Sequence, residues 1–232
     1  MNNRLIIFDL DGTLLNTLGD LATACNYMLS QRGLPSHTYE EYCSFVGNGI
    51  RRLVERALPE ELLSEEYVKA ARKDFMEYYI DHIDCKTQPY EGIPQLVASL
   101  QASGCKLAVV SNKFQAGTEK LIGKFFPQVE WVEVCGNREG VPLKPETDLI
   151  DIVLQKAGVA LDRCVMVGDS AVDVETAHNA GIHSIGVTWG FRSRKELEDA
   201  GAEHIVTTVD ELRELLSLLT IHLHINNTSS HR

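Results

Sequence analysis

Two acidic residues, Asp9 and Asp11, follow the apolar run of residues 5–8, and Gly12 comes next. The run has the length and composition of a strand that is buried on both faces, as in parallel sheets. Carboxylates at positions i and i+2 of an extended chain can project to the same side. Because close like charges are costly, the pair implies a bound metal ion or a shared proton. The alternative is a surface turn, in which Asp and Gly are common.

A second apolar run, residues 165–167, ends at Gly168 and Asp169, and Asp173 follows four residues later. If the turn is helical, this spacing brings the two carboxylates toward one place. Hard oxygen ligands of this kind suit Mg²⁺, which takes few carboxylates and keeps several waters. In the alternative interpretation, Asp169 and Ser170 only cap the helix that follows.

Two further candidates could bind an anion. Ser111 and Asn112 end the apolar run of residues 106–110, where a hydroxyl and a following backbone N–H could meet a phosphoryl oxygen. Lys144 precedes Pro145, which suits the first position of a helix, so its ammonium would lie beside a helix N-terminus that favours anions. Taken separately, Ser111 and Asn112 also fit a plain turn or helix cap, and Lys144 also fits a solvated surface lysine.

The elements that must position these residues fall into two groups. Between residues 16 and 86 four segments have helical spacing, with no convincing strand among them. From residue 89 onward strands and helices alternate, which predicts a parallel sheet with helices on both faces. The expected helices run from 18 to before Gly33 and over 38–46, 49–58, 64–82, 92–103, 115–125, 145–157, 172–180 and 209–219; the expected strands are 5–8, 106–110, 131–134, 164–167, 184–187 and 204–206.

Composition limits the class of protein. A chain of 232 residues predicts one large domain or two unequal ones. The net charge of −11 argues against general nucleic-acid binding and against adhesion to anionic lipid. Six scattered cysteines without a CxxC pair favour a reducing compartment. Because no apolar run approaches the roughly 18 residues of a membrane span and no signal peptide is evident, we expect a cytoplasmic protein.

Together, Asp9-x-Asp11-Gly12-Thr13, Ser111, Lys144 and Gly168-Asp169-Ser170-x-x-Asp173 resemble the four ordered motifs of the haloacid dehalogenase-like hydrolases. The likeness covers nearly the whole chain, including the helical insertion, where this family has a small cap domain. The segments 46–49, 54–58 and 186–191 are most similar to bacterial phosphoglycolate phosphatases.

The expected fold is therefore α/β. It consists of a doubly wound parallel sheet, a Rossmann-like core, with a small all-helical cap domain inserted after the first strand. We expect the core at residues 1–15 and 88–225 and the cap at 16–87, with hinges near 16–17 and 87–89. Residues 226–232 are polar, which is typical of a frayed tail.

The resemblance implies a Mg²⁺-dependent phosphatase that forms an aspartyl phosphate. Asp9 would attack phosphorus, and Asp11 would act as the general acid and base. The Mg²⁺ would be held by Asp9, Asp169 and the main-chain carbonyl of Asp11, with Asp173 as an outer ligand through water. The phosphoryl oxygens would be held by four polar side chains: Thr13, Ser111, Asn112 and Lys144.

Residues of the cap would determine the substrate specificity. Gly47 and Gly49 would let a loop approach the ligand closely, and Arg51 or Arg52 could meet an additional anionic group such as a carboxylate. The alternative for both arginines is a solvated helix face. Lys113 could also face the site, although lysines after such strands are often exposed.

We expect the substrate to be a small phosphate monoester, with the conversion of 2-phosphoglycolate to glycolate and phosphate as the leading reaction. The alternatives are a phosphomutase of the β-phosphoglucomutase type, a phosphatase of pyrophosphate or nucleoside monophosphates, and a non-catalytic phosphometabolite sensor. The complete acid set argues against a sensor, which has no need for Asp11 as a proton carrier. The sequence leaves open whether the protein is a monomer or a homodimer.

Overall fold

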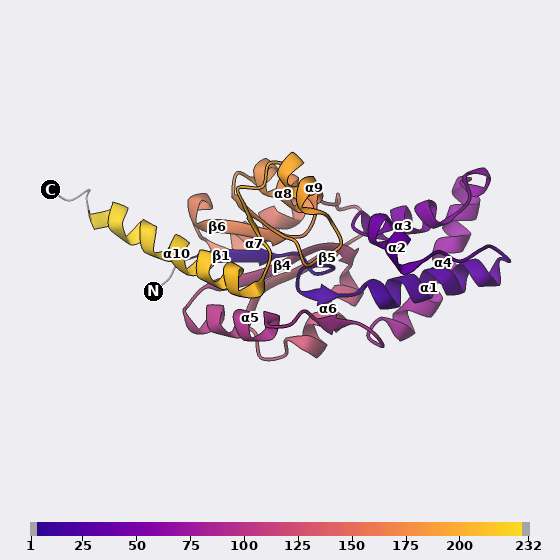
Figure 1. The fold of residues 1–232 in the computed structure, drawn as a ribbon, viewed down its shortest axis with the longest axis horizontal. Coiled ribbons are helices and arrows are strands. Elements are labelled where there is room, and N and C mark those ends of the chain that lie inside the picture. Colours follow the sequence, from indigo (N-terminus) through magenta and orange to yellow (C-terminus); the bar gives the residue numbers. More distant parts are fainter. Residues whose placement is uncertain (1–3, 229–232) are drawn as a thin grey trace.

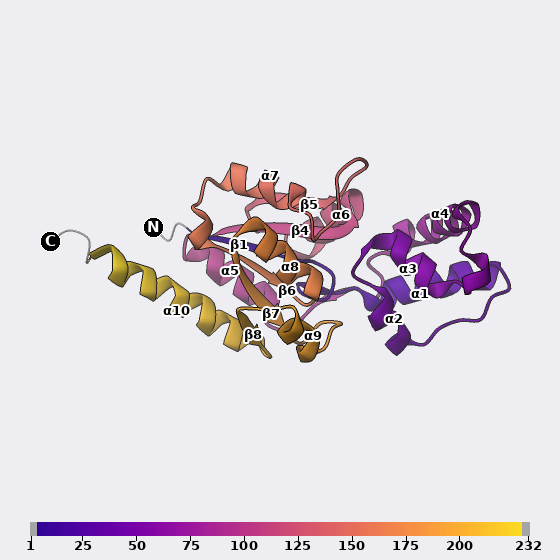
Figure 2. The same cartoon turned by 90° about the horizontal axis from the view of Figure 1, so that it is seen from above.

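The computed structural model describes residues 4–228, which form a six-stranded parallel sheet with a group of helices at one end of it (Figures 1 and 2). This confirms the predicted α/β class, a parallel sheet flanked by helices. The strands of the sheet are β1 (Leu5–Phe8), β4 (Lys106–Phe114), β5 (Trp131–Asn137), β6 (Cys164–Gly168), β7 (His183–Val187) and β8 (His204–Val206).

The strand order is β5-β4-β1-β6-β7-β8, so β1 is hydrogen-bonded to β4 on one side and to β6 on the other. The chain runs from β1 outward through β4 and β5 and then returns to β6 on the opposite side of β1. In open parallel sheets a ligand crevice forms where the strand order reverses, beyond the carboxyl ends of the strands. The residue that follows β1, Asp9, therefore lies at the place where this fold binds ligands.

Alternate side chains of β1 pack into two separate apolar clusters, one on each face of the sheet. Ile6 and Phe8 join the cluster that contains residues of α5 (Ile93–Ala102) and α10 (Val209–Thr228). Leu5 and Ile7 join the cluster that contains residues of α7 (Asp148–Ala157) and α8 (Ala171–Ala180). Burying each such side chain contributes about 1.5–3 kcal/mol, which fixes the register of the strand that carries Asp9.

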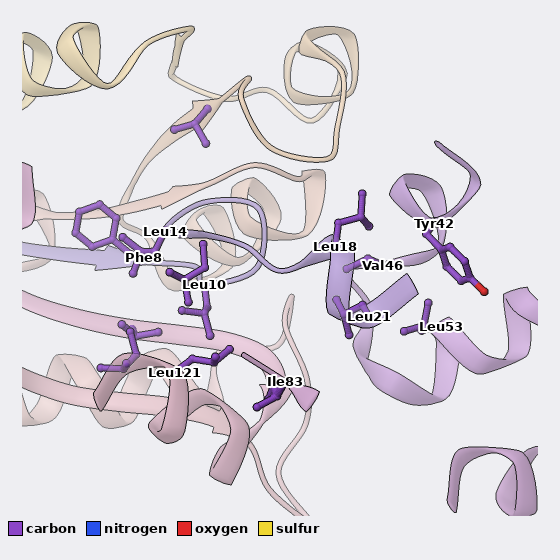
Figure 3. Packing of buried hydrophobic residues seen from close by; sticks show 14 of the residues in the cluster. Phe8, Leu10, Leu14, Leu18, Leu21, Tyr42, Val46, Leu53, Ile83 and Leu121 are labelled. Atoms are coloured by element: carbon purple, nitrogen blue, oxygen red, sulfur yellow. The ribbon is translucent and has the colours of Figure 1, made fainter. Parts of the chain in front are cut away.

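The helical insertion follows a short strand, β2 (Leu15–Asn16), and consists of α1 (Leu18–Gln31), α2 (Tyr39–Phe45), α3 (Gly49–Ala57) and α4 (Glu65–His82). Each helix was expected within one or two residues of these bounds. Helix α2 begins with a capping box, in which the Thr38 side chain accepts from the Glu41 backbone N–H and Glu41 accepts from that of Thr38. Figure 3 shows the buried residues of the two regions, with Phe8, Leu10 and Leu14 beside the sheet and Leu18, Leu21, Tyr42, Val46 and Leu53 among the helices.

The two chain segments that join the insertion to the sheet are tied together. Strand β2 pairs with β3 (Gln88–Pro89) in an antiparallel ribbon that the sequence did not predict. The buried carboxylate of Asp20, in the first turn of α1, accepts hydrogen bonds from the backbone N–H groups of Lys86 and Thr87 and from the Thr87 hydroxyl, at 2.8–2.9 Å. The expected boundaries of a core and a cap fall at this ribbon, and that division stays a prediction.

Several elements differ from the expectations. Helix α7 begins at Asp148 rather than Pro145, because residues 143–147 form a turn in which the Glu146 N–H donates to Leu143. Strand β4 continues to Phe114 instead of stopping at Val110, because its backbone still pairs with β5 there. The short helix α9 (Arg194–Asp199) was not predicted, because it is shorter than the window in which hydrophobic periodicity is informative.

At the C-terminus, α10 continues to Thr228, so Asn226, Asn227 and Thr228 are helical rather than frayed. Their weak helix propensity predicted an earlier end. The rest of the expected tail, residues 229–232, lies outside the described residues. Among residues 4–228, no helix combines the length and the apolar character needed to cross a membrane.

We expect Asp20→Asn to destabilise the protein, because an amide nitrogen would then face the backbone N–H groups of residues 86 and 87. Losing hydrogen bonds to a charged acceptor costs about 2 kcal/mol, which lowers the melting temperature by about 4–8 °C for a chain of this size. Thermal unfolding followed by circular dichroism measures the effect. The matched control is Asp81→Asn on the exposed side of α4, and equal melting temperatures for the two variants would contradict the role of Asp20.

Candidate active site

One cavity collects most of the residues that the motifs singled out. It lies between the end of β1 and the helical insertion, and its lining includes Asp9, Asp11, Gly47, Ser111, Asn112, Lys144, Asp169, Ser170 and Asp173. The core residues come from the ends of β1 and β6, from β4, from the turn before α7 and from the start of α8. Segments that are far apart in the sequence thus meet at the reversal point of the sheet.

Three buried carboxylates form the polar centre of this cavity. Asp9, Asp169 and Asp173 each offer an oxygen within 4.8 Å of the others, and each side chain is almost fully buried. The Lys144 ammonium donates to Asp9 Oδ1 at 2.8 Å and to Asp173 Oδ1 at 2.6 Å. When all three carboxylates are ionised, they carry −3 against the +1 of Lys144, which leaves two negative charges without a buried ammonium in this group.

The pKa values of the group reflect its burial and its excess of carboxylates. Burial, together with the nearby Asp173 and Asp11, raises the pKa of Asp9 to about 7 against the attraction of Lys144. Burial, with Asp173 and Asp9, also raises the pKa of Asp169 well above its usual value. Two unit charges at 4 Å repel by about 4 kcal/mol at an effective dielectric of 20. Three oxygen donors with excess negative charge therefore fit a divalent metal ion with a preference for oxygen ligands.

The orientation of Asp169 is fixed by its neighbours. The Phe191 N–H donates to Oδ2 at 2.7 Å, and the Thr13 hydroxyl donates to Oδ1 at 3.3 Å. Thr13 is fully buried, and its hydroxyl is engaged by Asp169, so its expected part in holding a phosphoryl oxygen stays a prediction. Gly12, at a φ of +92°, and Gly190 leave room for this carboxylate, because a Cβ on either would lie within 2.4 Å of Asp169 side-chain atoms.

Asp173 belongs to the capping box of α8. Its Oδ2 accepts from the Ser170 N–H at 3.1 Å and from the Ser170 hydroxyl at 2.7 Å, while Oδ1 accepts from Lys144. The residue therefore caps the helix and lies in the acidic group at the same time. For this motif, a helix cap and a place in a possible metal site are therefore compatible interpretations.

Asn112 connects three segments around the cavity. Its side-chain oxygen accepts from the Lys144 N–H at 2.8 Å, and its side-chain nitrogen donates to the carbonyls of Lys144 and Gly47, each at 3.2 Å. It thereby holds the turn that carries Lys144 and also contacts the insertion. Ser111, which is 2% exposed, lines the cavity beside it, and its hydroxyl oxygen accepts from the Lys113 N–H at 3.3 Å.

The Asp11 carboxylate lies outside the group of three and is paired with Lys113. The Lys113 ammonium is 3.1 and 3.3 Å from the two Asp11 oxygens and donates to the Tyr79 hydroxyl at 2.6 Å. Lys113 is buried, so it belongs to the site and is not a solvated lysine after a strand. The two acids of the first motif thus have different partners, Lys144 for Asp9 and Lys113 for Asp11.

The arginines expected to read the substrate do not reach the cavity. Arg51 is half exposed and donates to Glu55 at 2.8 Å and to Glu65 at 2.5 Å, and Arg52 donates to Glu55 at 2.7 Å. This corrects the position expected for Arg51, because Glu55 on α3 and Glu65 at the start of α4 draw it to the surface. The alternative of a solvated helix face describes both arginines.

Arg192 lines the cavity instead, and no sequence motif marked it. Its guanidinium donates to the carbonyls of Cys43, Ser44 (3.4 Å) and Val46 (2.5 Å) at the C-terminal end of α2. The remaining wall of the cavity on the insertion side is apolar and consists of Leu21, Val46, Ile50 and Leu53. The cavity therefore has a charged floor from the core and an apolar roof from the insertion.

If the three aspartates hold a metal ion, Mg²⁺ should stabilise the protein, because binding offsets their mutual repulsion. At 100 times the dissociation constant the gain is about 2.7 kcal/mol. The melting temperature of the wild-type protein should rise with Mg²⁺ at constant ionic strength, and that of Asp169→Asn should rise much less. Equal rises in both proteins would show that Mg²⁺ binds elsewhere.

Comparisons with known proteins agree with this geometry. Residues 6–187 match the family model described as haloacid dehalogenase-like hydrolase. The chain is 32% identical to a phosphoglycolate phosphatase of Mesorhizobium japonicum, over 93% of this chain and 97% of the relative. It is 31% identical to one of Aliivibrio fischeri, over 94% and 97%.

Solved structures show the same fold. One from Lactobacillus delbrueckii subsp. bulgaricus, provisionally assigned as a phosphoglycolate phosphatase, has a TM-score of 0.85 and 34% identity, covering 93% of this chain and 99% of that one. A predicted phosphatase from Clostridium acetobutylicum has a TM-score of 0.82 and 27% identity, covering 92% and 97%. The chain is therefore an enzyme of the haloacid dehalogenase-like hydrolase family, and it resembles phosphoglycolate phosphatases over nearly its whole length.

Proposed function

We propose that this enzyme is a Mg²⁺-dependent phosphatase that hydrolyses small phosphate monoesters through an aspartyl phosphate, with 2-phosphoglycolate as its leading substrate. The observation that carries the proposal is the unequal placement of the two acids of the first motif. Asp9 lies beside two carboxylates that could hold a metal ion and beside the Lys144 ammonium, whereas Asp11 is turned toward Lys113. The names of the phosphoglycolate phosphatase relatives support the choice of substrate.

The proposed reaction divides the work between these acids. An Asp9 oxygen forms a bond to phosphorus while the bond from phosphorus to the ester oxygen breaks, and Asp11 gives its proton to that oxygen. Water then forms a bond to phosphorus, the bond from Asp9 to phosphorus breaks, and a proton of the water passes to Asp11. Phosphate leaves, Asp9 is again ionised and Asp11 is again protonated.

The approach of an ionised carboxylate to a phosphoryl group is opposed by charge. A bound Mg²⁺, held by Asp9, Asp169 and the main-chain carbonyl of Asp11, would neutralise part of this negative charge. Asp173, already paired with Lys144 and Ser170, suits an outer ligand through water. Lys144 and the Ser111 hydroxyl would hold phosphoryl oxygens, over which a loose transition state spreads its charge.

We assign the helical insertion as a cap that closes over the phosphoryl site and excludes water. Core side chains already hold its segment 43–47, since Arg192 donates to three carbonyls there and Asn112 to that of Gly47. With Arg51 at the surface, the candidates for binding an anionic substrate tail are the backbone around Gly47 and Gly49, and the Arg192 guanidinium.

Asp9→Asn should abolish steady release of phosphate from every monoester that the wild-type enzyme hydrolyses, because the amide cannot form the aspartyl phosphate. The loss should be on the order of 10³-fold or more, measured as inorganic phosphate with Mg²⁺ over a panel of 2-phosphoglycolate, simple alkyl phosphates, pyrophosphate and nucleoside monophosphates. Retained activity in this variant would rule out Asp9 as the nucleophile. Interconversion of sugar phosphates with little phosphate release by the wild-type enzyme would instead indicate the phosphomutase.

Arg192→Ala should raise KM for 2-phosphoglycolate by about tenfold, because the loop at residues 43–47 loses hydrogen bonds to a charged donor. The matched control is Arg194→Ala, since Arg194 is half exposed and its ion pair with Glu198 is long, at 3.6 Å. Arg51→Ala should behave like this control. A KM change in Arg51→Ala as large as that in Arg192→Ala would contradict the assigned roles of both arginines.

A further inference from the structure

We propose that Tyr79 of the insertion and Lys113 of β4 are a positioning pair for Asp11. Together they fix the direction in which the Asp11 carboxyl faces the leaving-group oxygen. The inference rests on the proposed function, in which Asp11 moves the proton. It gives the insertion a part in catalysis in addition to the choice of substrate.

The contacts form a continuous chain from the insertion to the core. Tyr79, on the last turns of α4, accepts a hydrogen bond from Lys113 at 2.6 Å. Lys113 in turn reaches both oxygens of Asp11, at 3.1 and 3.3 Å. The ammonium also lies 5.0 Å from the centre of the Tyr79 ring, a distance at which a cation is attracted to an aromatic face.

Burial makes these contacts restrictive. The Lys113 side chain is 2% exposed and that of Asp11 is 14% exposed, so water can replace few of their hydrogen bonds. A buried ammonium must have acceptors for its N–H groups, and here the Asp11 oxygens and the Tyr79 oxygen supply them. Because Lys113 meets both carboxylate oxygens at nearly equal distances, rotation of the Asp11 carboxyl would break at least one contact.

Tyr79 is held in place by its surroundings. It is completely buried and packs against Phe75 and, edge to face at 6.1 Å, against Phe114 of the core. Burial, with the nearby Asp11 and Asp20, raises the pKa of its hydroxyl well above the usual value, so Tyr79 stays neutral. A neutral hydroxyl accepts a hydrogen bond from Lys113 but carries no negative charge. The charged partner of the Lys113 ammonium is therefore Asp11.

The leaving group provides the test of this arrangement. An alkyl oxygen, as in 2-phosphoglycolate, needs a proton when its bond to phosphorus breaks, whereas the phenolate of 4-nitrophenyl phosphate leaves without one. Tyr79→Phe removes only the hydroxyl and should lower kcat/KM for 2-phosphoglycolate about tenfold, as expected for the loss of one hydrogen bond to a charged group. This ratio reports the steps up to departure of the leaving group, so the later hydrolysis, in which Asp11 takes a proton from water for either ester, does not enter it. For 4-nitrophenyl phosphate, kcat/KM should change less than about twofold.

The chain offers a matched control in Tyr42→Phe. Tyr42 is also a fully buried tyrosine of the insertion, but its hydroxyl donates to Asn26 at 2.7 Å, away from the acids. This variant should treat both esters like the wild-type enzyme. A second variant, Lys113→Gln, should show the same selective loss for the alkyl ester, and its melting temperature shows whether it is folded.

Three outcomes are distinguishable. A selective loss of kcat/KM for the alkyl ester in Tyr79→Phe, absent in Tyr42→Phe, supports the positioning pair. Equal losses of kcat/KM for the two esters, or no loss, overturn it while leaving the phosphatase intact. If the wild-type enzyme releases no phosphate from either ester, or if Asp9→Asn remains active, the proposed function itself fails.

Discussion

The central physical feature of the site is a deficit of positive charge among its buried side chains. Asp9, Asp169 and Asp173 are buried together, and Lys144 is the one ammonium that contacts this group among the described residues. Such an arrangement is unfavourable in isolation, because desolvation and mutual repulsion both act against ionised carboxylates. A ligand that supplies positive charge relieves both effects, and the oxygen donors that are present suit a divalent cation.

The fold makes this concentration of charge possible. Strand β1 lies inside the sheet, with β4 and β5 on one side and β6, β7 and β8 on the other. Strands β1 and β6 are neighbours, so their carboxyl ends lie side by side. Large apolar side chains fix these strands from both faces, while glycines at positions 12 and 190 leave the space that the Asp169 carboxylate occupies. The rigid core therefore holds the acids close together, at a cost in free energy that apolar packing offsets.

The sequence predicts the features that depend on local patterns of residues. It does not predict side-chain directions that depend on contacts between distant segments. The strand at residues 5–8, the four helices of the insertion and the convergence of Asp9, Ser111, Lys144 and Asp169 all follow from periodicity and from the geometry of parallel sheets. The inward direction of Lys113 and Arg192, and the outward direction of Arg51, do not. Each direction is set by a partner that is distant in the sequence. The partner is Tyr79 for Lys113, the end of α2 for Arg192 and Glu65 for Arg51, and the local sequence pattern does not predict such a partner.

The different surroundings of the two acids also explain how they can take different roles at neighbouring positions. A nucleophile needs to be ionised close to the phosphoryl group, and Asp9 has a lysine and the proposed metal ligands beside it. In the proposed reaction the proton carrier needs a fixed direction and separation from a bound metal ion, and the Asp11 carboxylate lies outside the acidic group with its oxygens on Lys113. Because Lys113 is itself bound to Tyr79 of α4, the surroundings of Asp11 include the insertion whereas those of Asp9 are entirely in the core. Opening of the insertion would then leave the nucleophile in place and loosen the acid, which would link protonation of the leaving group to closure over the substrate.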